Sequence, residues 1–216
     1  MTHLRRIAMP KSFPLKRKGR EKYVIAQIGN AKTIPLLIVL RDILKIAKTR
    51  REARALLKAG EILVNNRKTD DERISVHLFD SVTITRLQKF FRVILKNNKF
   101  SLGEISEKES FTRICKIVSK KILSGGKVQI NLDNGYNLPS DLKAAVNDSV
   151  IFDFKANKII KHLPLKEKAS VEVIGGSHIG TKGILNKMEG RTAEIKADNS
   201  VIKIPLANVL VVENEK

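Results

Sequence analysis

The chain has 216 residues, of which 42% are hydrophobic, only 5% are aromatic and none is tryptophan. This length allows one large domain or two to three small ones, and the scarcity of aromatic residues favours several small cores. Lysine and arginine number 42 against 22 aspartate and glutamate residues, a net charge of +20 that indicates a polyanionic partner. Nucleic acid is the first candidate and an anionic membrane the second.

The positive charge is concentrated in the first hundred residues. Residues 1–34 and 35–100 each have a balance of +8, whereas residues 101–165 and 166–216 have +3 and +1. A single cysteine, Cys115, excludes an internal disulfide and fits a reducing compartment. The N-terminus lacks the apolar stretch of a secretory signal, and the longest apolar run is too short to span a bilayer. We therefore expect a soluble, cytosolic protein without a membrane partner.

The first 34 residues are predicted to form a basic N-terminal extension. Pro10, Pro14 and Gly19 prevent a continuous helix, and the density of charge opposes packing against the rest of the protein. We expect this segment to be largely disordered alone and ordered against phosphates. The basic residues assigned to RNA binding here are Arg5, Arg6, Lys11, Lys16, Arg17, Lys18, Arg20 and Lys22.

Two helices are predicted next. The apolar spacing from Ile34 to Ala47, with Pro35 in the first turn, predicts a helix that is buried on more than one side. Thr49 and Glu52 have capping-box spacing, so a second helix should begin there. Gly60 should end that helix, and a strand should follow at residues 62–64.

The second helix is predicted to be amphipathic, with one cationic flank. Ala53, Leu56 and Leu57 form its apolar stripe, and the basic residues lie round the helix from that stripe. Asn65 and Asn66 suit a tight turn because asparagine tolerates positive φ. The residues assigned to RNA binding in this region are Lys48, Arg50, Arg51, Arg54, Lys58, Asn65, Arg67 and Lys68.

The remainder of the chain is predicted to be rich in strands. Residues 75–79 and 80–84 should complete a small sheet with the preceding strand, and residues 88–165 should form a separate β-rich domain. Within it, Asn97-Asn98 predicts a hairpin, Ser106 and Glu109 could cap one helical turn, and glycines at 125, 126 and 135 separate long strands. The last unit, residues 166–216, contains a glycine-rich loop near His178 and Lys182, which we also assign to RNA binding.

Three motifs resemble known families. Ala53 to Asn65 (Ala-Arg-Ala-Leu-Leu-Lys-Ala-Gly-Glu-Ile-Leu-Val-Asn) resembles the core of the S4 RNA-binding domain, except that Asn66 stands where glycine is usual. The opening His3-Leu-Arg-Arg, followed by Pro10-Lys-Ser-Phe, resembles the start of the ribosomal protein S4e family. Lys168 to Ile184, with its spaced glycines, resembles the KOW motif of small SH3-like barrels. The resemblance to S4e runs in the same order along essentially the whole chain.

The resemblance implies an α+β fold with four parts: a basic N-terminal extension (1–34), an S4 RNA-binding domain with αα-β organisation (35–87), a β-rich central domain (88–165) and a C-terminal SH3-like KOW barrel (166–216). It implies a structural constituent of the small ribosomal subunit, in the cytoplasm, of archaeal/eukaryotic type. The implied partners are small-subunit rRNA of the 16S/18S type and neighbouring ribosomal proteins. Because the chain ends soon after the barrel, an archaeal source is expected.

Alternative functions are less compatible with the motifs. One alternative is an accessory factor of translation or transcription that binds transiently through its S4 and KOW elements. Only the N-terminal motif and the collinearity with S4e favour a ribosomal component over this alternative. An S4-bearing pseudouridine synthase would need a large catalytic domain and a carboxylate where Arg86-Leu87-Gln88 stands. The glycine spacing at 175–180 lacks the Gly-Lys-Ser/Thr of a P-loop. Four scattered histidines and one cysteine build no zinc cluster. We expect no enzyme, no cofactor and no small-molecule substrate.

Overall fold

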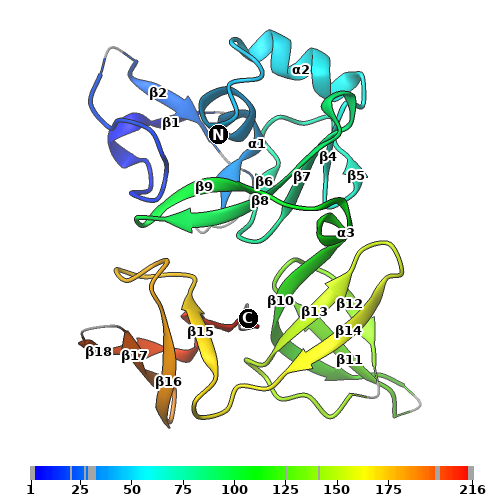
Figure 1. Ribbon diagram of the computed structural model, residues 1–216, viewed down its shortest axis with the longest axis vertical. Coiled ribbons are helices and arrows are strands. Elements are labelled where there is room, and N and C mark those ends of the chain that lie inside the picture. The colour runs from blue at the N-terminus through cyan, green and yellow to red at the C-terminus, as the bar shows by residue number, and fades with distance from the viewer. Residues whose placement is uncertain are drawn as a thin grey trace. The chain divides into compact units, whose positions relative to one another are not determined.

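The computed structural model describes residues 3–19, 21–26, 28, 33–124, 126–140, 142–197 and 200–213. The chain divides into two compact units, residues 1–111 and residues 112–216 (Figure 1). Helices are few and short, and antiparallel strands dominate both units. No helix in the described ranges is both long enough and apolar enough to cross a membrane.

Among its described residues, the first unit combines six short helical segments with a five-stranded antiparallel sheet of order β5-β4-β7-β8-β9. Two smaller pairings, β1 with β2 and β3 with β6, accompany it. The strands are β1 (His3–Arg5), β2 (Tyr23–Ile25), β3 (Ile34–Pro35), β4 (Ile62–Val64), β5 (Arg67–Lys68), β6 (Ser75–Val76), β7 (Ser81–Ile84), β8 (Lys89–Lys96) and β9 (Lys99–Glu104). The helical segments are η1 (Arg6–Ala8), α1 (Leu36–Ile38), η2 (Val39–Ile43), α2 (Arg50–Lys58), η3 (Thr85–Leu87) and α3 (Glu107–Ser110).

The second unit contains two five-stranded antiparallel sheets, of order β12-β11-β10-β13-β14 and β18-β17-β16-β15-β19. The first is built from β10 (Thr112–Ile122), β11 (Val128–Leu132), β12 (Asn137–Pro139), β13 (Ser149–Asp153) and β14 (Lys158–Leu163). The second is built from β15 (Ser170–Val173), β16 (Lys182–Glu189), β17 (Thr192–Ala197), β18 (Ser200–Pro205) and β19 (Val209–Val211), with the 3₁₀ turn η4 (Leu206–Asn208) before the last strand.

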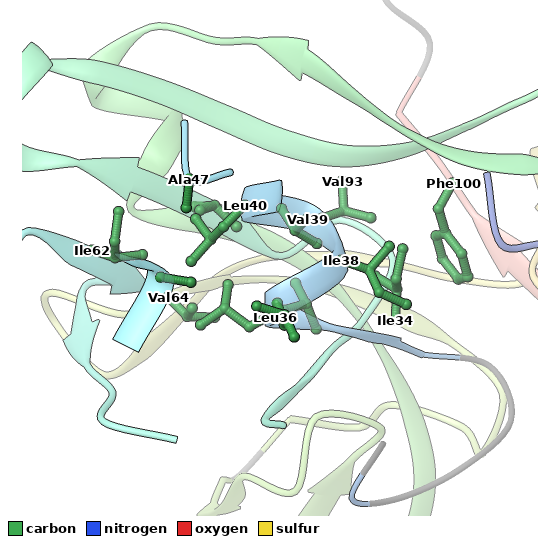
Figure 2. Close-up of a cluster of buried hydrophobic side chains, with 14 of the residues drawn as sticks. Ile34, Leu36, Ile38, Val39, Leu40, Ala47, Ile62, Val64, Val93 and Phe100 are labelled. Carbon is green, nitrogen blue, oxygen red and sulfur yellow. The ribbon is translucent and has the colours of Figure 1, made fainter. Parts of the chain in front are cut away.

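The core of the first unit is organised around α1 and η2. All residues from Thr33 to Leu40 are buried, and the side chains of this segment lie among those of β4, β8 and β9 (Figure 2). Leu36, Ile38 and Leu40 are fully buried, with no exposed area. A segment that is apolar on all sides can only be stable when covered on all sides, which explains why it lies in the middle of the unit.

The predicted helix from Ile34 to Ala47 is shorter than expected. Ile34 and Pro35 are extended and pair with Val76 and Ser75 of β6, so the helix begins at Leu36 with Pro35 as its N-cap residue. It then widens into the π-helical turn η2, in which Leu44 N–H donates to the carbonyl of Val39. Lys45 has φ of +56°, a left-handed conformation that an α-helix cannot continue through. Strand pairing before the helix and this residue after it set the two limits.

The expected disorder of the N-terminal segment is wrong for its described residues. Met9 and Phe13 are 1% and 2% exposed and belong to the core of the first unit. The Phe13 ring contacts that of Phe100 at a centroid distance of 6.5 Å, and the Phe100 N–H donates to the Ser12 carbonyl at 2.8 Å. Charge density alone gave the wrong expectation, because the apolar side chains between the cations pack into the core while the charged groups remain in solvent. Arg20 lies outside the described residues.

The expected boundary at residues 87/88 falls inside a sheet. β8 pairs with β7 from Ser81–Arg92 to Ile84–Lys89, and the hairpin β8–β9 therefore extends the sheet of the first unit. The compact division lies between Phe111 and Thr112. The composition of the sequence could not reveal that β8 belongs to this sheet, because composition does not report which strands pair with each other.

Several local predictions are confirmed. Asn97 and Asn98, both at positive φ, form the two-residue turn between β8 and β9. Ser106 and Glu109 form a reciprocal capping box at the start of α3.

Within the second unit, the buried Lys116 ammonium joins the two sheets. It donates to the carbonyl of Leu206 and, at 2.6 Å, to that of Val209.

Candidate nucleic-acid interface

Helix α2 presents the predicted cationic flank. Thr49 is its N-cap residue and accepts a hydrogen bond from the Glu52 N–H at 3.2 Å, while the Glu52 carboxylate accepts from the Lys48 N–H at 2.8 Å. Ala53 and Leu57 have no exposed area. Since these two residues fix one side of the helix against the core, the basic residues at 50, 51, 54 and 58 are all exposed. The predicted orientation of this helix is confirmed.

Two arginines of α2 are held by one buried carboxylate. The Arg50 guanidinium donates to Glu72 Oε1 at 2.6 and 2.9 Å, and Arg54 Nε donates to Glu72 Oε2 at 2.8 Å. The Glu72 side chain is only 3% exposed, whereas both arginines are half exposed. Hydrogen bonds from Arg54, and then from Arg50, lower the pKa of Glu72 to about 2 against the opposing effect of burial. The pair of arginines carries one net positive charge after this neutralisation.

The Glu72 main chain is also fixed. Its carbonyl accepts from the Leu37 N–H at 2.9 Å, which joins the segment before β6 to α1. Beside it, the Arg73 guanidinium binds both oxygens of Asp71 at 2.9 to 3.2 Å and lowers the pKa of that carboxyl. A shallow hollow on this side of α2 is lined by three cations and three carboxylates: Arg54, Lys58, Asp70, Asp71, Glu72 and Arg73.

Arg51 and Lys58 differ from the two arginines bound to Glu72. Both are exposed, and within the described part of the chain neither forms an ion pair. Lys48, just before the helix, is also exposed. These side chains are the members of the flank that are most available to an external anion.

The turn after β4 has a mainly structural role for Asn65. Asn65 and Asn66 have φ of +50° and +61°, and they join Val64 to Arg67 as a two-residue hairpin turn. The Asn65 amide donates to Asp80 Oδ1 at 2.8 Å and its oxygen accepts from the Ser81 N–H at 3.0 Å. Both polar ends of this side chain are engaged within the protein, so we leave Asn65 out of the proposed surface. Arg67 and Lys68 beside the turn are exposed.

Gly60 ends α2 as predicted, with φ of +70°. A Cβ built at this glycine would lie 3.4 Å from Cε and Nζ of Lys68, so the lysine ammonium lies near the C-terminal end of the helix. The unpaired carbonyls of a helix C-terminus favour a cation at that position. Lys68 therefore stabilises α2 in addition to any role it has in binding.

The paired strands β1 and β2 with the loop between them, here called the N-terminal hairpin, bring a second set of cations together. Arg6 donates to the Lys16 carbonyl at 2.6 Å and to Glu21 at 2.8 Å, and Arg17 donates to the Met9 carbonyl. These bonds assign Arg6, whose side chain is 14% exposed, mainly to holding the segment closed. The predicted RNA-binding residues that remain exposed here are Arg5, Lys11, Lys16, Arg17, Lys18 and Lys22.

The predicted loop in the second unit lies between β15 and β16. Gly176 and Gly180 have φ of +93° and +84°, and His178 and Lys182 are exposed. Lys182 pairs in register with Glu172, a buried carboxyl. Burial raises the pKa of Glu172, and the nearby Lys182 charge opposes this only in part. Gly183 is required for a different reason from the one predicted. A Cβ there would lie 2.6 Å from the Lys196 carbonyl oxygen, so close strand packing excludes a side chain.

The sequence reasoning missed Glu72 and Tyr23. Glu72 lies 22 and 18 residues from the arginines that it binds, and no local spacing connects them. Tyr23 is an exposed aromatic residue directly beside the N-terminal cations. The sequence signal that could have identified Tyr23 is an aromatic residue within a basic segment, a combination typical of single-strand binding. Among the described residues no cluster of three histidine, cysteine or acidic side chains is arranged to hold a metal ion.

The chain falls into the class of proteins that carry an S4 domain, because the S4 domain model matches residues 34–82. The model described as ribosomal family S4e matches residues 87–159. The small ribosomal subunit protein eS4 of Archaeoglobus fulgidus is 31% identical over 99% of this chain and 87% of its own length. That of Methanothermobacter thermautotrophicus is 33% identical over 86% of this chain and 78% of its own length.

The chain belongs to the eS4 family of ribosomal proteins, a family of structural rather than enzymatic proteins. The crystal structure of the 30S ribosomal protein S4e from Thermoplasma acidophilum has the same fold. It aligns with a TM-score of 0.72 at 20% identity and covers 84% of this chain and 95% of that one.

Proposed function

We propose that this protein is a structural constituent of the small ribosomal subunit that binds rRNA through its N-terminal hairpin and its S4 domain. The exposed cationic flank of α2, fixed outwards by the buried Ala53 and Leu57, is the observation that carries this proposal. Its family membership supports the subunit assignment. The partners are rRNA of the 16S/18S type and neighbouring proteins of the same subunit, in the cytoplasm.

Recognition in this proposal depends on shape and phosphates. The major groove of an RNA helix is too deep and narrow for side chains to read, whereas its backbone presents regularly spaced anions. Arg51, Arg54 and Lys58 bind these phosphates, with Arg50 held beside them by Glu72. The cations flanking this helix extend the contact: Lys48, Arg67 and Lys68.

We also propose the finer division of the chain. Residues 166–216 act as a KOW-type SH3-like domain whose loop, with His178 and Lys182, approaches the RNA backbone. The support is the antiparallel sheet β18-β17-β16-β15-β19, with a glycine-containing loop that joins β15 to β16. The edge strands β18 and β19 do not pair with each other among the described residues, so this sheet forms an open half-barrel. Residues 35–87 and 88–165 are the S4 and central domains in functional terms, although β8 and β9 complete the sheet of the former.

A salt titration against an rRNA fragment tests the interface. Replacing Arg51, Arg54 and Lys58 by alanine should lower the slope of log affinity against log salt by about 2 to 3, since each lost phosphate contact lowers it by about 1 and Arg54, which is paired with Glu72, contributes less than the other two. A matched control removes three exposed lysines of the second unit, Lys120, Lys121 and Lys127, and so changes the net charge equally. The assignment of this surface is wrong if both triple variants have the same effect.

Co-sedimentation separates a subunit component from a transient factor. A structural component should remain with small ribosomal subunits through a high-salt wash, because neighbouring RNA and protein enclose it. Release in that wash would favour the accessory-factor function instead.

A further inference from the structure

The N-terminal hairpin has one inward and one outward face. Leu4 pairs in register with Val24, which is 7% exposed, and both belong with the core of the first unit. Side chains alternate along a strand, so the neighbouring pair, Arg5 and Tyr23, lies on the opposite, outward face. Tyr23 is 55% exposed and contacts the His3 ring edge to face, with centroids 5.0 Å apart. An aromatic ring is thus held beside a guanidinium on the solvent side of the hairpin.

This outward face borders a hollow whose walls are already fixed. Its lining includes Tyr23, Ile7 and five cations: Arg5, Arg6, Arg17, Lys18 and Lys22. The Arg6 N–H donates to the Lys22 carbonyl at 2.9 Å, and its side chain closes the segment through Lys16 and Glu21. Burial of Met9 and Phe13 anchors the same loop to the core. The hollow is therefore part of the folded unit and does not depend on a ligand to form.

The charges of the hollow are largely uncompensated. Glu21 is the acidic residue of its lining, and Arg6 neutralises it. For Arg5, Lys18 and Lys22 the described residues provide no carboxylate partner within ion-pair distance, since Glu21 is paired with Arg6. A cation-rich hollow with an exposed ring and an exposed aliphatic side chain, Ile7 at 75%, suits a ligand that is both flat and anionic. A nucleotide has this combination.

We infer that this hollow binds one unstacked nucleotide of a single-stranded RNA segment, with its base on the Tyr23 ring and its phosphate among Arg5, Lys18 and Lys22. A base inside a duplex has no free face, so an RNA helix would offer the site only phosphates. Stacking on an aromatic ring combined with backbone neutralisation is the general mode of single-strand binding. This inference rests on the proposed function and adds to it a site distinct from α2.

The test uses the full-length protein and a heptaribonucleotide carrying 2-aminopurine at its central position, with fluorescence as the readout. Binding should change the fluorescence of the modified base. Tyr23→Ala should weaken oligonucleotide affinity about tenfold, as expected for the loss of one base–aromatic stack, and Tyr23→Phe should retain it. Because the Tyr23 side chain is largely exposed, its replacement should leave the thermal unfolding curve unchanged, which checks that the hairpin is intact.

The control is a hairpin duplex from rRNA, titrated against the same variants. Tyr23→Ala should bind it like the unmodified protein, while the triple alanine variant of α2 should lose affinity for it. Equal oligonucleotide affinity of Tyr23→Ala and the unmodified protein would overturn the nucleotide site and leave the proposed function standing. Failure of the unmodified protein to bind either RNA would overturn both. Tyr23-dependent binding to phosphatidylserine vesicles in preference to the oligonucleotide would overturn the RNA assignment in favour of a membrane.

Discussion

Replacing Glu72 by glutamine tests whether one buried carboxylate organises the basic side of α2. Glutamine has the same shape but no charge, and its amide N–H₂ group would face an arginine donor. The pKa of Glu72 falls from an ordinary value of 4.5 to about 2 in the folded protein. At about 1.4 kcal/mol per pKa unit, this sets an upper limit of about 3–4 kcal/mol on its contribution to stability. Since Arg50 and Arg54 are half exposed to solvent, we expect about 1–2 kcal/mol at pH 7.

The pH dependence gives the sign of the effect. A carboxyl whose pKa is lower in the folded state stabilises the protein above its unfolded pKa, and the stabilisation is lost as pH falls through the folded pKa. The free energy of unfolding of Glu72→Gln should therefore lie below that of the unmodified protein at pH 7. This difference should shrink between pH 5 and pH 2, where Glu72 becomes protonated in the unmodified protein.

Urea unfolding followed by circular dichroism at several pH values measures this difference. Glu107→Gln is the matched control, because it removes an equal charge from an exposed position on α3. A double-mutant cycle with Arg54→Ala isolates the coupling between Arg54 and Glu72. A difference that stays constant from pH 7 to pH 2, or that Glu107→Gln reproduces, would refute the assigned role of Glu72.

Two further substitutions test the packing of the two units. Gly183→Ala places a Cβ 2.6 Å from the Lys196 carbonyl oxygen, so it should destabilise the second unit by about 1–3 kcal/mol in thermal unfolding. Gly103→Ala is the control and should be tolerated, because its Cβ would lie 3.5 Å from the nearest atom. Equal effects would show that the β16–β17 approach is not the constraint. Leu57→Ala truncates a fully buried side chain of α2 and should lower the free energy of unfolding by about 2–5 kcal/mol. RNA binding should also weaken, because the helix that carries the cations is less firmly held. Ala55→Ser, at an exposed position of the same helix, should have little effect on either quantity. A stable Leu57→Ala variant would mean that α2 does not depend on this contact.

Features set by neighbouring residues could be predicted from the sequence. The start of α2 at Thr49, its end at Gly60 and the asparagine turns all depend on side chains within a few residues of the backbone they stabilise. The burial of Ala53 and Leu57, and with it the outward direction of the cations, follows from the helical period alone. The orientation of the candidate interface was therefore accessible before the structure.

Features set by tertiary pairing could not be predicted in this way. The shortening of the helix after Pro35 depends on pairing with β6, about 40 residues later in the chain. The attachment of β8 and β9 to the first unit depends on the register with β7. Packing of Met9 and Phe13 was hidden by the charges between them, since average charge density does not report the direction in which individual side chains point. In each case a non-local contact overrode a local preference.

The same distinction changes how the basic residues of this protein should be counted. In the sequence, every lysine and arginine counts as one charge available for binding. In the structure, Arg6 is bound to Glu21 and to a main-chain carbonyl, and Arg50 and Arg54 both bind Glu72. Arginines held in this way lose less side-chain freedom on meeting a phosphate, but each added contact gains less because a carboxylate lies behind it. The fixed arginines therefore contribute mainly to the geometry of binding, and free cations such as Arg51 and Lys58 contribute most of its salt dependence.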